Sequence, residues 1–194
     1  MNILYLIRHG KTLANEQHLY CGSTDLPLSE TGKQELRKLH YTIPVPCIYL
    51  TSGMQRTDQT LKLLFGNVQY QIDTRFREID FGVFELKSYD DLKENPAYQE
   101  WISGDNEQKC PPKGESAIQM KHRVLEGYKN LIDLLEHGDN HIVLVTHGGV
   151  IASLMEYLFP YEYKNRYQWQ PQPGYGYEIN HNSYKELVPN ENII

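Results

Sequence analysis

The sequence predicts an α/β fold, with a mostly parallel sheet between two layers of helices. Apolar runs typical of strands alternate along the chain with stretches in which apolar residues recur at helical spacing. The first run, Ile3–Ile7, carries no polar group except the Tyr5 hydroxyl, as expected for a strand that is covered on both faces. Parallel strands are joined by right-handed crossovers, which place helices on both faces of the sheet. The predicted fold class is therefore a three-layer α/β/α sandwich with a mostly parallel central sheet.

Strand and helix signals continue to alternate after this first run. Ser29 offers an N-cap to the next helix, and the turn Thr51-Ser52-Gly53 separates a strand from the helix that follows it. The expected elements, in chain order, are a helix from Ser29 to about His40, a strand at Cys47–Leu50, a helix from Met54 to about Phe65, a strand at Val68–Ile72, a helix from Ala117 to about His137, a strand at His141–Val145, a helix at Ile151–Leu158, and an edge hairpin of Tyr175–Ile179 and Tyr184–Val188.

The clearest helix signal lies at Ala117–His137. Ser116 and Gln119 have the spacing of a capping box, and Gly138 supplies a stop. Between them, apolar residues repeat at helical spacing. Residues 83–112, by contrast, are polar, acidic and rich in turns, with two short helices expected around Asp90–Asn95 and Ala97–Ser103. At this length we expect one domain, residues 1–194, with residues 83–112 as an insertion that caps one end of the sheet.

Composition narrows the classes of function. The net charge of -6 and the pI near 5.7 argue against nucleic acid as a partner, because nonspecific binding needs a basic face. A mean hydropathy of -0.59 argues against a membrane protein. The N-terminus resembles no signal peptide, so a cytoplasmic location is expected. Cys21, Cys47 and Cys110 form no CxxC pair, and we expect free thiols rather than a disulfide or metal site.

Cationic groups follow three expected strands. Arg8 and His9 come directly after the first strand, Arg56 lies just beyond the second, and His147 follows the strand at His141–Val145. Ligands of such sheets bind beyond the carboxyl ends of the strands. A cluster of two guanidiniums and two imidazoles without a counter-charge would be costly, so a dianion is expected there.

A phosphoryl group fits this expectation. Arginine matches phosphate oxygens with forked donors, and Gly148-Gly149 at a helix start offers backbone amides to an anion. Asn15 could add a neutral donor or simply be a turn residue. The predicted partner is thus a small-molecule phosphomonoester.

Hydrolysis of such an ester needs a nucleophile and a proton donor. A neutral imidazole can attack phosphorus, which makes His9 and His147 the candidates. The leaving oxygen needs a carboxylic acid nearby, and Glu78, Asp80 and Glu85 all remain open on this reasoning.

Three competing motifs fail. Gly10-Lys11-Thr12 resembles the end of a P-loop, but the first glycine of that motif would fall at Tyr5. His137 and His141 have metal-ligand spacing, yet a turn separates them, so no metal site is expected. No cysteine has an arginine six positions later, as cysteine phosphatases require.

The chain resembles the histidine phosphatase superfamily, the phosphoglycerate mutase-like group, over nearly its whole length. The motifs that carry the resemblance, in family order, are Arg8-His9-Gly10-x-Thr12-x-x-Asn15, Asp25-Leu26-Pro27-Leu28-Ser29-x-x-Gly32, Thr51-Ser52-x-x-x-Arg56-Thr57-x-x-Thr60, Glu78-x-x-Phe81-Gly82, Gly114-Glu115-Ser116 and Thr146-His147-Gly148-Gly149.

The resemblance implies a phosphoglycerate mutase-like fold and a role for each matching residue. His9 would become phosphorylated, Arg8, Arg56 and His147 would form the rest of a phosphate pocket with Gly148, and Asn15 would also contact phosphate. Glu78 matches the family's proton donor, so the resemblance selects it from the three carboxyls. No metal or other cofactor is implied.

The resemblance leaves the substrate open. Small members of the group include alpha-ribazole phosphatases, phosphoserine phosphatases and broad-specificity enzymes that are called mutases. Many of them read Trp-Glu-Gly where this chain has Phe84-Glu85-Leu86. The resembled cofactor-dependent mutases carry adjacent arginines before the late histidine and Gly-Asn-Ser after it, whereas this chain has Gly149-Val150, which favours hydrolysis. A noncatalytic phosphate-binding regulatory module is the alternative of another class, and the presence of both His9 and Glu78 argues against it.

Two surface features carry further expectations. The rim residues Cys21, Gly22, Ser23 and Thr24 should face the leaving group together with the insertion. Tyrosines at positions 161, 163, 167, 175 and 177 are compatible with a homodimer interface and equally with ordinary surface.

Overall fold

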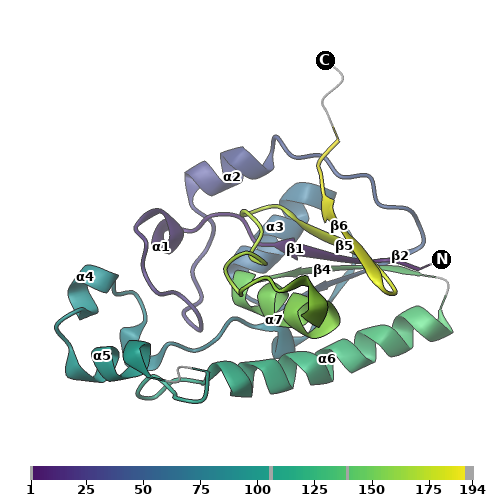
Figure 1. The fold of residues 1–194 in the computed structure, drawn as a ribbon. Coiled ribbons are helices and arrows are strands. Elements are labelled where there is room, and N and C mark those ends of the chain that lie inside the picture. The colour runs from purple at the N-terminus through teal and green to yellow at the C-terminus, as the bar shows by residue number, and fades with distance from the viewer. Residues whose placement is uncertain (1, 105–106, 139, 191–194) are drawn as a thin grey trace.

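A six-stranded sheet forms the centre of the computed structural model, which describes residues 2–104, 107–138 and 140–190 (Figure 1). Neighbouring strands of the sheet are β3 (Tyr70–Ile72), β2 (Cys47–Thr51), β4 (His141–Thr146), β1 (Leu4–Arg8), β5 (Gly176–Asn180) and β6 (Ser183–Leu187). The first four strands of this order are parallel, β5 pairs antiparallel with β1, and β6 pairs antiparallel with β5. The mostly parallel sheet and its edge hairpin are confirmed.

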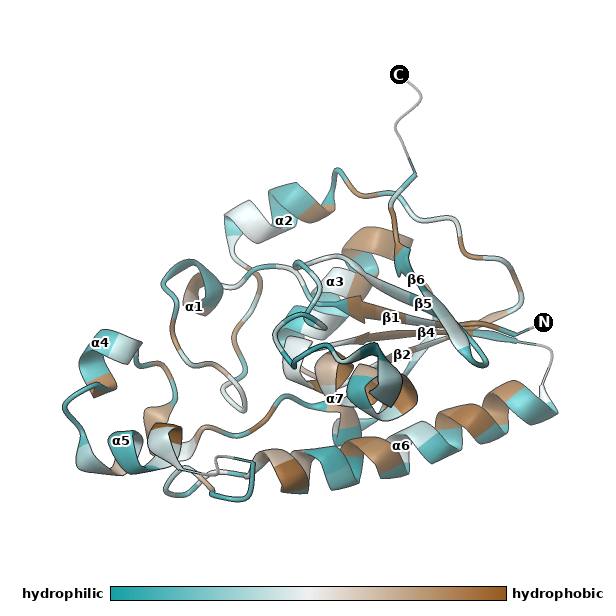
Figure 2. Ribbon diagram, in the orientation of Figure 1, coloured by the Kyte–Doolittle hydropathy of each residue, from teal (hydrophilic) through white to brown (hydrophobic). Residues whose placement is uncertain are grey.

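Helices cover both faces of this sheet. α6 (Ala117–His137) and α7 (Gly148–Leu158) lie on one side, and α2 (Glu30–Leu36) and α3 (Gln55–Phe65) lie on the other (Figure 1). Successive β1 residues serve opposite layers: Leu6 packs in one core cluster with Val124 of α6, whereas Ile7 packs in a second cluster with Leu61 of α3. The central strands are accordingly hydrophobic along their length (Figure 2). The predicted three-layer sandwich is confirmed.

α6 has the caps that its sequence predicted. The Ser116 hydroxyl accepts from the N–H of Gln119, and the Gln119 side chain accepts from the N–H of Ser116. Its apolar residues face the sheet while its polar residues face outward, which gives the alternating bands of Figure 2. At Gly127 the helix passes directly over the Phe76 ring, and an added Cβ would lie 2.7 Å from a ring carbon. This contact anchors the 3₁₀ turn η1 (Thr74–Phe76) that precedes Glu78.

Several boundaries differ from those expected. α2 ends at Leu36 rather than near His40, because the N–H groups of Lys38 and Leu39 bond to carbonyls three residues back and tighten the chain into turns. α7 begins at Gly148, three residues earlier than expected. A short helix α1 (Leu13–Glu16) was missed, because four residues show no periodicity; its signal was the capping pair of Thr12 and Asn15.

The insertion forms a small unit beyond the carboxyl ends of the parallel strands (Figure 1). The turn η2 (Gly82–Phe84) leads into α4 (Tyr89–Leu92) and α5 (Pro96–Ser103), close to the two helices expected. Phe84, Leu92 and Tyr98 are fully buried in a hydrophobic cluster of their own, against which Tyr20 and Trp101 pack. The insertion therefore has a separate core at the edge of the sheet where ligands are expected.

Other sequence expectations have definite positions in the structure. All three cysteines are free thiols, of which Cys110 is exposed. Of the five tyrosines considered for an interface, Tyr177 is buried in the core and the other four are exposed, Tyr161 and Tyr163 almost fully. The turn η3 (Pro160–Glu162) carries the first of them. Among the described residues, no helix has the length and apolar character needed to cross a bilayer.

The backbone at Leu86 generates a stability prediction. Leu86 has a φ of +57° and is partly exposed, and its N–H donates to the Tyr20 carbonyl at 2.7 Å. Residues that carry a Cβ are disfavoured at positive φ, whereas glycine adopts this conformation readily. We predict that Leu86→Gly is more stable than Leu86→Ala by about 1 kcal/mol in urea unfolding, because both variants lose the same side-chain contacts. Equal stability of the two variants would contradict a strained conformation at this position.

Candidate active site

The segment Arg8-His9-Gly10 leaves β1 in a fixed conformation. Its backbone extends the sheet beyond the last residue of the strand and then contacts α3. Three N–H groups hold it: Arg8 donates to the Tyr175 carbonyl, His9 to the Thr146 carbonyl and Gly10 to the Thr60 hydroxyl, each at 2.9 Å. The side chains of Arg8 and His9 therefore start from a rigid edge of the sheet.

The His9 imidazole is held with one nitrogen free. Its Nδ1 lies 2.7 Å from the Gly10 carbonyl oxygen, and because a carbonyl only accepts, Nδ1 carries the proton. The lone pair is then on Nε2. Burial lowers the pKa of His9 well below its ordinary value of 6.5, and the nearby charges of Arg56 and Arg8 lower it further. His9 is thus a neutral imidazole with an available nucleophilic nitrogen.

His147 lies beside His9 in the opposite tautomer. The two ring centroids are 5.1 Å apart in an edge-to-face arrangement. The Arg56 Nε donates to His147 Nδ1 at 3.3 Å, so the proton is on Nε2, which lies 2.8 Å from the Ser52 hydroxyl. Burial, followed by the charge of Arg56, lowers the pKa of His147 well below 6.5. Both imidazoles are therefore neutral, and the positive charge of the cluster comes from its arginines.

Arg56 comes from the first turn of α3 and is only 1% exposed. Besides His147, it contacts the rim loop: Nη1 donates to the Thr24 carbonyl at 2.8 Å and Nη2 to the Gly22 carbonyl at 2.6 Å. These bonds use three of its five N–H groups, and the other two remain for an anion. Burial lowers the pKa of Arg56, but a guanidinium remains charged at neutral pH.

Arg8 supplies the second charge. Its Nη1 donates to the Pro171 carbonyl at 2.8 Å, whereas its Nε is buried and has no acceptor among the described residues. Within residues 2–104, 107–138 and 140–190, neither Arg8 nor Arg56 forms an ion pair with a carboxylate. A largely covered guanidinium with no carboxylate in ion-pair contact is the arrangement expected for an anion site.

Two neutral donors lie near this cluster. Asn15 Oδ1 accepts from the N–H and hydroxyl of Thr12, each at 3.0 Å, which leaves the Asn15 amide N–H groups to donate. Asn15 and Arg8 line the same cavity, of about 570 Å³. Gly148 is the first residue of α7, so its N–H has no intrahelical acceptor, and an added Cβ there would lie 3.2 Å from the Arg8 guanidinium carbon.

Glu78 is held at the start of α7. Its Oε2 accepts from the Gly149 N–H at 2.9 Å, and its Oε1 accepts from the Ile79 N–H at 3.0 Å. A Cβ on Gly149 would lie 2.4 Å from Oε1, so any larger residue there would displace the Glu78 carboxyl. The Gly149 amide, which the sequence offered as an anion donor, therefore binds Glu78 instead.

The two other candidate carboxyls have structural partners. Asp80 accepts from the Gly82 N–H at 2.7 Å within its own turn. Glu85 binds backbone amides of the rim loop, among them the N–H of Gly22 at 3.0 Å. Of the three carboxyls considered, Glu78 alone lines the larger cavity beside Arg8. The geometry thus supports the choice that the family resemblance made.

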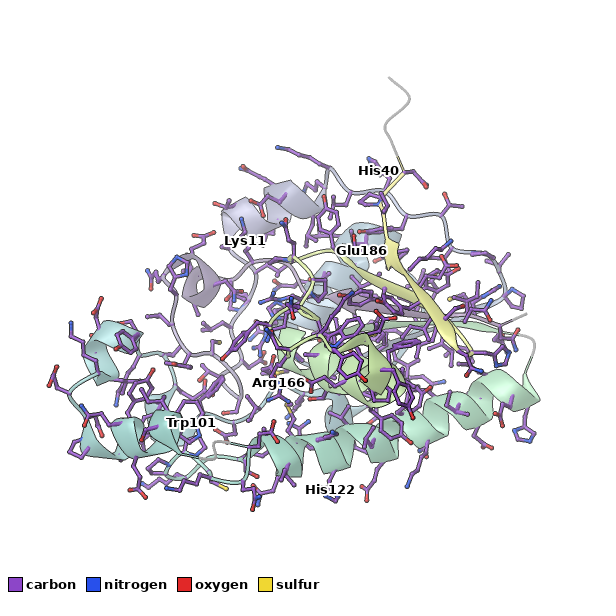
Figure 3. The ribbon with its side chains drawn as sticks, viewed as in Figure 1. Lys11, His40, Trp101, His122, Arg166 and Glu186 are labelled. Carbon is purple, nitrogen blue, oxygen red and sulfur yellow. The ribbon has the colours of Figure 1, made fainter. Side chains whose placement is uncertain are left out.

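This larger cavity has a volume of about 820 Å³. Arg8, Glu78 and Gly149 are among the residues that line it. Trp101 from α5 and Arg166 from the segment after α7 also line it, and Figure 3 shows them on either side of the space between the insertion and α7. Its remaining lining includes apolar side chains of Leu19, Tyr20, Ile79, Phe81, Ile102, Ala117 and Met120.

The rim residues have different positions. Cys21 lines this cavity, and burial raises the pKa of its thiol. Gly22 and Thr24 direct their carbonyls to Arg56, and Ser23 is exposed. Among the four, Cys21 is the one placed to face a leaving group.

Sequence reasoning assigned no role to several residues that shape the site. Ser52 and Thr60 belong to one of the family motifs, and that membership could have pointed to them. The Ser52 hydroxyl contacts His147 Nε2, and the Thr60 hydroxyl accepts from the Gly10 N–H. Arg123 had no signal, because it is one of many polar residues on α6. Its guanidinium pairs with Glu115 and donates to the carbonyls of Arg75, Arg77 and Glu78, which fixes the backbone that carries the Glu78 carboxyl.

Known proteins of similar sequence or structure include phosphatases and a probable phosphoglycerate mutase. The model of the histidine phosphatase superfamily (branch 1) matches residues 4–190. The adenosylcobalamin/alpha-ribazole phosphatase of Escherichia coli K12 is 31% identical over 161 residues, which are 80% of this chain and 78% of that protein. A probable phosphoglycerate mutase, GpmB, of Enterobacter sp. strain 638 is 30% identical over 78% of this chain and 72% of its own. The crystal structure of a putative alpha-ribazole-5'-P phosphatase from E. coli K-12 superposes with a TM-score of 0.80 at 27% identity, over 100% of this chain and 98% of that one.

The two buried histidines generate a prediction about pH. Their pKa values lie well below 6.5 in the folded protein and return to about 6.5 in the unfolded chain. As pH falls below about 6.5, the unfolded state binds protons that the folded state does not, so the free energy of unfolding falls. Below pH 6.5, each histidine lowers the free energy of unfolding by about 1.4 kcal/mol per pH unit, until the pH reaches the folded pKa of that histidine. Above pH 6.5 neither histidine changes the free energy of unfolding.

Urea unfolding between pH 7.5 and 5 tests this. Below pH 6.5, we expect the free energy of unfolding to depend less steeply on pH in His9→Asn than in the wild-type protein. The difference in slope should correspond to one proton, about 1.4 kcal/mol per pH unit. His122→Asn, on an exposed part of α6 (Figure 3), is the matched control and should leave the slope unchanged. Identical slopes for the wild-type protein and His9→Asn would show that His9 is not held neutral by folding.

Proposed function

The chain belongs to the histidine phosphatase superfamily (branch 1), and we propose that it hydrolyses a phosphomonoester through a phosphohistidine on His9. The observation that carries this proposal is the hydrogen bond from His9 Nδ1 to the Gly10 carbonyl, which leaves Nε2 with its lone pair. This nitrogen lies beside buried His147 and Arg56 and near Arg8, and neither guanidinium forms an ion pair with a carboxylate in the described structure. Those are the requirements for nucleophilic attack on a bound phosphoryl dianion.

In the first step, Arg8, Arg56, His147, Asn15 and the Gly148 amide bind the phosphoryl oxygens. The lone pair of His9 Nε2 forms a bond to phosphorus as the bond from phosphorus to the ester oxygen breaks. The protonated Glu78 carboxyl gives its proton to the leaving oxygen, which departs as an alcohol. The guanidiniums stabilise the negative charge on the transferring group.

In the second step, water replaces the alcohol. Glu78, now a carboxylate, takes a proton from the water as its oxygen attacks phosphorus, and the bond to His9 Nε2 breaks. Inorganic phosphate is released, the Glu78 proton is restored and His9 is neutral again. Glu78 suits both roles, because the Gly149 and Ile79 amides fix its carboxyl in the wall of the cavity.

The leaving alcohol is proposed to be large, with alpha-ribazole 5'-phosphate as the leading substrate. The cavity of about 820 Å³ is of the size that binds whole cofactors and drug-sized ligands, and much of its wall is apolar. The names of relatives agree with this choice: one is an alpha-ribazole phosphatase at 31% identity. We further infer a cytoplasmic location, which the three free thiols support, because disulfides are rare in that reducing compartment.

Phosphoglycerate mutase activity is the second candidate, favoured by the relatives that carry that name. It uses the same histidine chemistry but returns the phosphoryl group to the organic product. A cavity of this volume, with apolar side chains along part of its wall, is unnecessary for a substrate as small and acidic as phosphoglycerate. A noncatalytic phosphate-binding module would need neither the free His9 Nε2 nor the fixed Glu78.

The covalent intermediate is directly testable. After brief mixing with a ³²P-labelled phosphomonoester and denaturation in alkali, the wild-type protein should carry acid-labile phosphate on His9. Glu78→Gln should still bind substrate but turn over at least a hundredfold more slowly, because its side chain cannot donate the proton. His9→Ala should carry no label. Label that persists in His9→Ala would overturn the assignment of the nucleophile.

A rate survey tests the leaving group. We expect kcat/KM for alpha-ribazole 5'-phosphate to exceed that for phosphoserine, sugar phosphates and 3-phosphoglycerate by at least tenfold, with inorganic phosphate released. Equal values across these esters would favour a broad-specificity phosphatase. Conversion of 3-phosphoglycerate to 2-phosphoglycerate without phosphate release would favour the mutase instead.

A further inference from the structure

Glu85 has an unusual set of partners for a carboxylate so close to a cationic site. Its two oxygens accept from the backbone N–H groups of four residues, and it forms no ion pair with a cation in the described part of the chain. The bonds are to Phe81 at 3.0 Å, Gly22 at 3.0 and 3.1 Å, Ser23 at 3.0 Å and Thr24 at 3.2 Å. Three of these four amides belong to the rim loop, more than sixty positions earlier in the sequence.

The same loop binds Arg56 through its carbonyl groups. The amides of Gly22 and Thr24 donate to Glu85, and their carbonyls accept from Arg56 Nη2 and Nη1. The loop also lies tightly against the backbone below it, because a Cβ on Gly22 would come within 1.6 Å of the Ile79 carbonyl oxygen. The loop is therefore fixed between a carboxylate on one side and a guanidinium on the other.

Arg56 transmits this order to the histidines. Its Nε bond to His147 Nδ1 sets the His147 tautomer, and its remaining N–H groups are those available to phosphate. If the loop carbonyls moved, Arg56 would lose two of its three acceptors inside a buried site. Its guanidinium would then turn toward other acceptors, away from the direction that serves the ligand.

We propose that Glu85 is a positioning residue for the phosphate site, acting through the rim loop on Arg56. This inference rests on the proposed function, because it assumes that Arg56 binds phosphate. The chemistry explains why a carboxylate stands here. Four N–H donors converge on one group, and only an ionised carboxylate presents acceptors alone. The four amide donors stabilise the Glu85 charge, so its oxygens bind the loop and Phe81 and neither forms an ion pair with Arg56.

Glu85→Gln is therefore a sharp test, since glutamine has the same shape but turns an NH₂ group toward backbone N–H donors. Asp80→Asn is the matched control: Asp80 is a carboxyl of the same segment whose bond to Gly82 stays within its own turn. We would measure the Kd for inorganic phosphate by calorimetry on the full chain, with circular dichroism as a check of folding. The expected result is at least tenfold weaker binding in Glu85→Gln and less than a twofold change in Asp80→Asn.

A double-mutant cycle separates positioning from general loosening. In an Arg56→Lys background, the two guanidinium hydrogen bonds to the rim-loop carbonyls are already lost. Glu85→Gln should therefore weaken phosphate binding less than threefold in that background. A tenfold loss in both backgrounds would overturn the proposal, because Glu85 would then act independently of Arg56. An equal loss in Asp80→Asn would also overturn it.

Each remaining outcome is decisive as well. Phosphate binding that is unchanged in Glu85→Gln would overturn this inference and leave the proposed function intact. A wild-type protein that binds no phosphate would overturn both. If Glu85→Gln does not fold, Glu85→Asp keeps the charge but is too short to reach all four amides, and at least threefold weaker binding is expected; wild-type affinity in that variant would overturn the proposal.

Discussion

The buried guanidinium of Arg56 is the group on which the rest of the site depends. It lies where α3 begins, yet it donates to the rim loop and to a histidine that follows β4. One side chain thus connects a loop near the N-terminus, the second strand-helix unit and the last parallel strand. Each of these parts is anchored separately in the fold, so Arg56 has little freedom to move. A phosphate ligand would meet donors that are already in place, and little ordering would remain to oppose binding.

Burial also determines which form of each basic group the site contains. Imidazoles beside two guanidiniums in a dry environment lose their protons, so the pKa values of His9 and His147 are both low. Guanidiniums cannot lose theirs at neutral pH. The same environment therefore produces a neutral nucleophile and fixed positive charges. The two tautomers follow from neighbouring acceptors and donors: a carbonyl at His9 and a guanidinium at His147.

The sequence was most informative where a physical pattern extends over many residues or repeats at several strand ends. The run Ile3–Ile7 and the capped helix at Ala117–His137 predicted a covered sheet, and cations after three strands predicted one shared edge. It was least informative where a partner is backbone. In the sequence, Glu85 was one of three equivalent candidate carboxyls. The residues around it do not indicate that its oxygens accept from the N–H groups of Gly22, Ser23 and Thr24. For the same reason, the Gly149 amide was offered to an anion when it binds Glu78.

The segment Phe84-Glu85-Leu86, which differs from the resembled Trp-Glu-Gly motif at two positions, combines two structural roles: its flanking residues shape the insertion, and its glutamate binds the rim loop. Phe84 is fully buried in the core of the insertion against Tyr98 and Trp101, so it shapes the cap rather than the phosphate site. Leu86 occupies a left-handed position for which the resembled Trp-Glu-Gly motif has glycine. The glutamate between them, which binds the rim loop, is the one position unchanged. A cap can therefore change in shape, and with it the alcohol that leaves, while the group that orders Arg56 stays the same.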